Sequence, residues 1–216
     1  MSRPGRGRRA AGSGPIRFSG RELKDLAAAW LALGLAFTLF LSRPAAFALA
    51  ADLGAGTAVA FLVEFVRSLL TVGVGFLLHE LAHKVVAVRF GQVAEFRADY
   101  GMLGLAVAAG LAGFLFAAPG AVYHRGQITD RENGLIALAG PVTNVALALA
   151  FLPLVLLPAP LAGVGELGVA VNLLLAAFNM LPFGPLDGRK VLAWSRVVFA
   201  AVFGPLAAIA LVVFLL

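Results

Sequence analysis

The sequence of 216 residues contains no cysteine, and only 13% of its residues are charged. Without cysteine, neither a disulfide framework nor a thiolate metal site can form, so any bound metal must be held by nitrogen and oxygen ligands. The hydrophobic share of 61% lies well to the apolar side of ordinary globular domains. The composition therefore predicts an integral membrane protein.

Long apolar runs take the place of the missing charge. A helix needs roughly 20 apolar residues to cross a hydrocarbon core about 30 Å thick. We therefore expect an all-α polytopic membrane protein with about five transmembrane helices. The runs that reach or approach this length are Leu26–Leu41, Ala58–Phe90, Gly134–Leu157, Leu161–Leu181 and Val197–Leu216.

A sixth apolar run, Leu103–Ala118, decides the topology of everything after it. If it crossed the membrane, all later spans would invert and the basic residues that follow it would face outward, against the positive-inside rule. We therefore interpret Gln92–Arg131 as a small insertion on the cytoplasmic side, with strand-like segments (AEFRADYG and AVYHRGQITD) on both sides of the apolar run. The run itself is expected to re-enter or to lie at the interface.

Positive charge gathers at the beginning of the chain, whose net charge is +6. We expect residues 1–20 to form a basic, disordered arm that contacts anionic lipid of the bilayer, with no nucleic acid as partner, and residues 21–216 to form one membrane domain. The N-terminus is then cytoplasmic. The basic residues before the first span are Arg3, Arg6, Arg8, Arg9, Arg17, Arg21 and Lys24.

Three ionisable residues interrupt the second apolar run, in the sequence His79-Glu80-Leu81-Ala82-His83. On a helix, positions i and i+4 share a face about 6 Å apart along the axis, so both imidazoles can reach one metal ion. Glu80 flanks that face and is placed to act as a general base. The alternative is a pair of core histidines with an incidental acid, but each polar group costs a few kcal/mol to insert into the membrane. The pattern therefore favours a metal site, with zinc as the ion.

A third ligand is required, and Asp187 is the main candidate. It follows a hydrophobic helix in the turn Pro182–Gly188, and the expected topology places it on the same side as the two histidines. On local sequence alone it could equally be a turn aspartate beside proline and glycine. His124 is the rival ligand, although its polar surroundings favour a loop residue or a contact with a substrate strand.

Two motifs together resemble the site-2 protease family of intramembrane zinc metalloproteases: HELAH at His79–His83 and NMLPFGPLDG at Asn179–Gly188. The resemblance covers a core of about residues 72–194. It implies one Zn²⁺ per chain held by His79, His83 and Asp187, with Glu80 as base, and cleavage within or near a transmembrane helix of another membrane protein.

The resemblance also implies smaller roles. Asn179 matches the family asparagine that helps to position substrate or stabilise the oxyanion, and GPVTN at Gly140–Asn144 resembles a family element of less defined role. The strand-like segments resemble family strands that could pair with an unwound substrate. The second motif departs from the commoner LDGG because Arg189 follows Gly188, and the effect of that change is open.

Several interpretations remain open at this point. Asn144 and Asn172 could belong to the site or could be hydrogen-bond contacts between helices. An inactive relative that binds transmembrane helices, or a metal transporter or sensor, is the alternative function. The transporter predicts further ligands along a path, and His124 is the one histidine left for that purpose. The active site is expected to face the cytoplasm.

Overall fold

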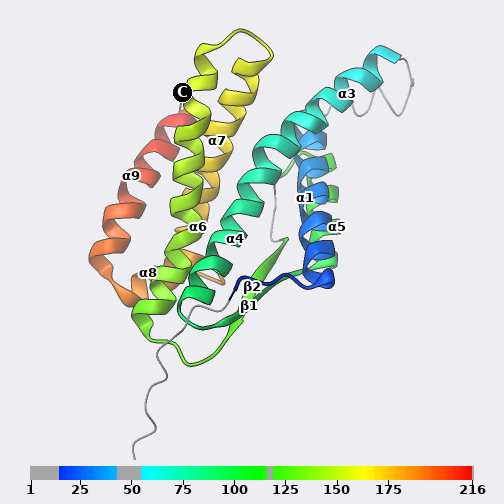
Figure 1. Ribbon diagram of the computed structural model, residues 1–216. Helices are drawn as coiled ribbons and strands as arrows, with labels where there is room; N and C mark the ends of the chain where they lie inside the picture. The colour runs from blue at the N-terminus through cyan, green and yellow to red at the C-terminus, as the bar shows by residue number, and fades with distance from the viewer. Residues whose placement is uncertain (1–14, 43–54, 116–118, 216) are drawn as a thin grey trace, which may run out of the picture.

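The computed structural model describes residues 15–42, 55–115 and 119–215 (Figure 1). Most of the predicted basic arm, residues 1–14, lies outside the described residues. The described elements are α1 (Gly20–Leu41), α3 (Ala55–Ser68), η1 (Leu69–Gly73), α4 (Val74–Arg89), β1 (Val93–Ala98), α5 (Tyr100–Ala112), β2 (Gly120–Arg125), α6 (Asp130–Phe151), η2 (Leu152–Leu156), α7 (Leu161–Asn179), α8 (Asp187–Trp194) and α9 (Arg196–Leu215).

Four helical segments are long and apolar enough to cross a membrane: Gly20–Leu41, Gly56–Arg89, Asp130–Leu156 and Leu161–Asn179. The predicted all-α polytopic membrane fold is confirmed. The fifth predicted run forms α9, which belongs with α5 among the shorter apolar helices of the described chain.

The longest segment joins α3, η1 and α4 into one helix with a π-helical turn in its middle. A π turn widens the helix and changes which backbone groups are paired. Here the indole nitrogen of Trp30 in α1 donates to the carbonyl of Leu69, over 3.0 Å. A Cβ on Gly73 would lie 2.3 Å from Cδ1 of Trp30, so the glycine permits this close approach of α1. Just before the π-helical turn, Arg67 and Glu64 form an ion pair at 2.9 Å.

Helix α4 lies between two groups of elements. Figure 1 shows α6 and α7 on one side of it and α1 with α5 on the other. A Cβ on Gly75 of α4 would lie 2.7 Å from Oδ1 of Asn172 in α7, so this glycine brings the two helices close. The arrangement places His83 of α4 against Ile136 near the start of α6, and His79 and His83 against Asp187, the first residue of α8.

The insertion between α4 and α6 forms a two-stranded antiparallel sheet with α5 between its strands. In its register Val93 lies opposite Arg125 and Ala98 opposite Gly120. The segment between the strands leaves and returns at one end of the sheet, where Asp99 N donates to Pro119 O over 3.1 Å. A single crossing of the membrane is thereby excluded, and α5 packs along α1, where a Cβ on Gly110 would meet the carbonyl of Ala36. The predicted extended segments are confirmed, and residues 103–112 of the apolar run are helical, in a segment whose two ends meet at the same end of the sheet.

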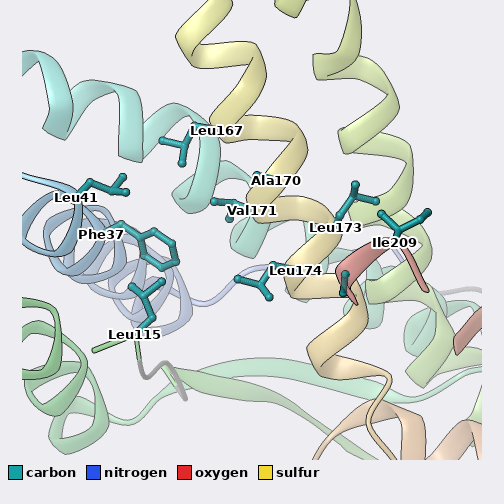
Figure 2. A pocket seen from close by; sticks show the side chains of 10 residues that line it. Phe37, Leu41, Leu115, Leu167, Ala170, Val171, Leu173, Leu174 and Ile209 are labelled. Atoms are coloured by element: carbon teal, nitrogen blue, oxygen red, sulfur yellow. The ribbon is translucent and has the colours of Figure 1, made fainter. Parts of the chain in front are cut away.

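An apolar cavity of about 150 Å³ lies between α1, α7 and α9, with the end of the α5 segment below it. Figure 2 shows the Phe37 ring of α1 directed toward Val171 and Leu174 of α7, with Leu115 beneath it. Every side chain lining this cavity is apolar. It therefore offers space to hydrocarbon and no group for chemistry.

Candidate metal centre

The two histidines of the HELAH sequence and Asp187 meet at one point. His79 and His83 lie one turn apart on α4, and Asp187 is the first residue of α8. Nε2 of His79 lies 3.3 Å from Oδ2 of Asp187, and Nε2 of His83 lies 3.1 Å from the same oxygen. All three side chains are buried, and their potential ligand atoms lie within 4.8 Å of one another. Among the described residues this is the one such group of three or more.

The far nitrogen of each imidazole is held by an oxygen acceptor. Nδ1 of His79 lies 2.6 Å from Oδ1 of Asn144, and Nδ1 of His83 lies 2.7 Å from the carbonyl of Ile136. Because both partners can only accept, each Nδ1 carries a proton, and each Nε2 is the nitrogen that faces the centre, where its unprotonated form can bind a metal ion. Such outer contacts orient histidines that bind metal and raise their basicity.

Asn144 is fixed in turn by two further bonds. Its amide nitrogen donates to the carbonyl of Gly75 over 3.1 Å and to Oδ1 of Asn172 over 2.8 Å. These bonds orient the amide, so its oxygen faces His79. Asn172 donates back to Gly168 of its own helix. Asn144 therefore touches a candidate ligand directly, whereas Asn172 acts behind it as a contact between helices.

Space for the two imidazoles is made by Gly140 of α6. A Cβ at this position would lie 2.5 Å from Nε2 of His79 and 2.6 Å from Nε2 of His83. Both distances are far inside van der Waals contact, so no larger residue fits while the rings keep their positions. The GPVTN element thus contributes a gap at Gly140 and an acceptor at Asn144, one turn apart on one face of α6.

Asp187 is held where the chain turns from α7 into α8. A Cβ on Gly188 would lie 2.0 Å from the carbonyl of Met180, so the glycine lets α8 begin against the end of α7. Burial by itself raises the pKa of the Asp187 carboxyl, but His83 and His79 outweigh it and hold that pKa below its ordinary range. Lys190 lies 3.5 Å from Oδ1, the oxygen turned away from the histidines. The carboxylate is therefore ionised, with the two histidines at Oδ2 and Lys190 at Oδ1.

The donor set fits zinc. Two imidazole nitrogens and one carboxylate oxygen are the protein ligands of hydrolytic zinc sites, which keep a fourth position for water or substrate. Two features of this chain fit such a site. The buried ligand atoms of three side chains converge at one point, and the lack of a Cβ at Gly140 leaves space for the two imidazole rings. His79, His83 and Asp187 are the residues that would hold the ion.

Glu80 lies beside this centre and is in contact with the sheet. Its side chain is buried, and Oε2 accepts a hydrogen bond from the backbone N–H of Val122 in β2 over 3.1 Å. Among the described residues no hydrogen bond occupies Oε1. One oxygen of the carboxylate is thus fixed by the strand while the other is available for proton transfer.

The remaining predicted residues lie at different distances from the centre. His124 is a β2 residue outside the three-residue group, and burial together with the charges of Lys190 and His83 lowers its pKa. Asn179 donates to the carbonyl of Leu175 in its own helix, so its role in positioning substrate stays a prediction. Arg189 is exposed and reaches back to the carbonyl of Gly184 at 3.5 Å, on the loop before α8.

Three features of the centre were not predicted from the sequence: the carbonyl of Ile136, the space at Gly140 and Lys190. Every residue has a backbone carbonyl, so the sequence could not indicate that the carbonyl of Ile136 pairs with His83. Lys190 could have been noticed, because it lies one helical turn after Asp187 and such pairs face each other on a helix.

Replacement of Asn144 by leucine tests the orienting contact. Leucine is similar in size but accepts no hydrogen bond, so the His79 ring loses its partner. We expect the affinity for Zn²⁺ to fall by about 10–100-fold, as for other outer contacts of metal ligands. Competition with a fluorescent zinc chelator measures it. Asn179→Leu is the control and should leave the affinity unchanged, whereas an Asn144→Leu protein with unaltered affinity would contradict the assignment.

Comparisons with known proteins agree with this geometry. The chain is 44% identical over 196 residues to the Methanocaldococcus jannaschii protein named "Putative zinc metalloprotease MJ0611", and the match covers 88% of this chain and 93% of the relative. It is 34% identical over 146 residues to "Putative zinc metalloprotease YwhC" of Bacillus subtilis, covering 57% of this chain and 66% of that protein. A match of 35% over 153 residues to "Putative zinc metalloprotease Rip3" of Mycobacterium tuberculosis covers 67% of this chain and 32% of the relative. No family model matches the chain, and no solved structure matches it significantly.

Proposed function

The chain belongs to the zinc metalloprotease family of these relatives, and from that premise we propose that it hydrolyses peptide bonds within or near transmembrane helices of other membrane proteins. The observation that carries the proposal is the buried group of His79, His83 and Asp187, with Glu80 beside it, in a domain built from helices of membrane-spanning length. A purely structural role does not explain this group of side chains, because each buried polar group costs free energy in a membrane.

A bound zinc ion supplies Lewis acidity, which polarises a peptide carbonyl and makes water more acidic. The chain supplies the movement of protons. Glu80 takes a proton from the attacking water at Oε1 and later delivers it to the leaving nitrogen, while Oε2 stays bonded to Val122 N. His79 and His83 keep their protons on Nδ1, because Asn144 and the Ile136 carbonyl accept them there.

The outer edge of β2 is the proposed platform for the substrate. Val122 N points away from β1 and toward Glu80, so the outward groups of β2 lie beside the metal centre. The outer edge of β1 is already covered by carboxylates of α1, at Phe96 N and Ala98 N. An extended substrate can add to a sheet only at an edge with unpaired backbone groups. A substrate helix that unwinds locally would present its carbonyl here, with Asn179 as the proposed second donor to the oxyanion.

The apolar character of the molecule supports a substrate that is itself embedded in lipid. The cavity between α1, α7 and α9 is lined by apolar side chains alone, and Val171 on its wall directly precedes Asn172, which bonds to Asn144. Apolar side chains of a substrate would find hydrocarbon-like space along α7. A soluble polar peptide would gain nothing from it.

The sheet, the metal centre and the N-terminus of α1 are proposed to face the cytoplasm. Basic residues of the described chain concentrate at this end, which the positive-inside rule places in the cytoplasm. The basic residues of that end include Lys24, Arg89, Arg97, Arg125, Arg131, Arg189 and Lys190.

Because the chain lacks cysteine, single cysteines can test this orientation. Gln127→Cys lies in the exposed loop after β2, and Ala159→Cys lies in the exposed loop before α7, at the opposite end of the helices (Figure 1). We expect a membrane-impermeant thiol reagent added to intact cells to label Ala159→Cys and to label Gln127→Cys only after lysis. The reverse pattern would overturn the proposed orientation.

The function itself is tested with purified protein in lipid nanodiscs and a panel of single-span substrates. We expect about one zinc ion per chain, loss of cleavage on removal of the metal by chelator, and recovery on addition of Zn²⁺. Mass spectrometry of the products should place the cut within or next to the hydrophobic span. Zinc bound without cleavage of any substrate would favour the helix-binding alternative, and an absence of bound zinc would overturn the site.

A further inference from the structure

The most deeply buried ion pair of the described chain lies next to the metal centre without belonging to it. Lys84 directly follows His83 in α4, and Glu22 is near the start of α1; their exposed fractions are 1% and 0%. The Lys84 ammonium donates to Oε2 of Glu22 and, over 2.7 Å, to the carbonyl of Arg17. It also lies 4.0 Å from the centre of the Phe18 ring. The chain therefore supplies this buried cation with a full set of partners.

The other oxygen of Glu22 extends the contact to the sheet. Oε1 of Glu22 accepts the backbone N–H of Phe96 in β1 over 3.0 Å. Phe96 lies directly opposite Val122 of β2, and Val122 N is the donor to Glu80. A closed ring of contacts thus runs from Lys84 in α4 through α1, β1 and β2 back to Glu80, one turn earlier on the same helix.

A second contact between α1 and β1 fixes the strand along its length. Asp25, one turn after Glu22, accepts the N–H of Ala98 over 3.3 Å and the hydroxyl of Tyr100 over 2.8 Å. The outward N–H groups of Phe96 and Ala98 in β1 are thus taken by carboxylates of α1 instead of a third strand. If β2 slipped by one residue along β1, a different set of its backbone groups would face Glu80. The register of the sheet therefore decides whether Val122 N can donate to the Glu80 carboxylate.

The ring of contacts is more than a source of stability. Replacing a buried ion pair by apolar residues of similar size is often neutral or stabilising, so stability alone is a weak reason to keep one. We propose that Glu22 and Lys84 are positioning residues that hold the β1–β2 sheet in place, and through Val122 N hold Glu80 in its working orientation. The catalytic part of this inference rests on the proposed function, whereas the placement of the sheet does not.

The test uses Glu22→Gln, Lys84→Met and the double variant of the full chain in nanodiscs. Each single variant leaves an unpaired buried charge or polar group and can fail to fold. The double variant removes both charges and the bonds of Lys84 to α1, and the glutamine that replaces Glu22 can accept from Phe96 N only as a neutral amide, a weaker bond than the carboxylate makes. The control is Glu64→Gln combined with Arg67→Met, which removes the ion pair in α3 far from the sheet. Zinc content, kcat and KM are measured on each.

Sheet position is read separately from activity. Nitroxide labels are placed at Tyr123→Cys on β2 and Val142→Cys on α6, both exposed, and their separation is measured by pulsed electron spin resonance. In the parent we expect one narrow distance distribution. In the Glu22→Gln/Lys84→Met protein we expect a broad or shifted distribution, zinc still near one per chain, and kcat lower by about 10–100-fold with a smaller change in KM. The control should match the parent throughout.

Each other result overturns the inference. An unchanged distance distribution in the double variant rules out the anchor, whether or not activity falls. A displaced sheet with unchanged kcat rules out the catalytic consequence, and loss of zinc would mean that the pair supports the metal site as a whole. If the parent cleaves no substrate at all, the proposed function has failed, and the label distances still decide whether Glu22 and Lys84 anchor the sheet.

Discussion

Glu80→Gln is expected to lower kcat by about 10²–10⁴-fold, the usual contribution of a general acid or base. Glutamine has the same shape and can still accept the N–H of Val122, but it cannot take a proton from water. Zinc content should stay near one per chain, because Glu80 is not one of the three grouped side chains. The rate is measured with a single-span substrate in nanodiscs, and the metal by elemental analysis.

Glu64→Gln is the matched control for that experiment. It makes the same chemical change on the same long helix, at the ion pair with Arg67 and away from the metal centre. It should leave kcat and zinc content at parental values. Equal cleavage by the Glu80→Gln and parent proteins would exclude Glu80 as the base, and loss of zinc in Glu80→Gln would instead make it a ligand or a support of one.

Gly140→Ala is expected to weaken zinc binding by more than about 100-fold, beyond the usual effect of losing an outer contact of a ligand. The added Cβ would lie 2.5 Å from Nε2 of His79 and 2.6 Å from Nε2 of His83, so both rings must leave the positions in which they meet Asp187. Backbone of α6 cannot yield easily, because it also holds Asn144 and the Ile136 carbonyl against the same rings. Zinc affinity is measured by chelator competition.

Gly204→Ala in α9 is the control, because its Cβ would meet no atom within 4 Å. Alanine favours a helix interior over glycine by about 0.5–1 kcal/mol, so the control should bind zinc normally and be no less stable. A Gly140→Ala protein that binds zinc as tightly as this control would show that the space at Gly140 is not needed for the metal.

Much of the fold was predictable because membrane insertion is a strong constraint on sequence. An apolar run of sufficient length has few alternatives to a helix, so Leu26–Leu41 and Ala58–Phe90 could be assigned from composition and length. The metal centre was predictable for a similar reason. His79 and His83 share a helix face by spacing alone, and ionisable groups in an apolar run are too costly to be incidental.

Other features needed the tertiary structure. The course of Leu103–Ala118 follows from the pairing of β1 with β2, since the bond from Asp99 N to Pro119 O brings its two ends together. Hydrophobicity alone does not distinguish a segment that crosses the membrane from one whose two ends lie on the same side. The roles of Asn144 and Asn172 also depended on packing, because only the approach of α6 and α7 to α4 shows which amide touches His79.

The sequence by itself determined that the chain is a helical membrane protein, and it predicted that two histidines of one helix bind a metal ion with a glutamate beside them. Both follow from local periodicity and from the cost of placing charge in hydrocarbon. The tertiary structure brings Asp187, the predicted third ligand, to the two histidines, and it decided what orients each imidazole and how the Lys84–Glu22 pair contacts the sheet that holds Glu80. The orienting contacts join residues that lie far apart in the chain, such as His79 and Asn144, and no local pattern encodes such contacts.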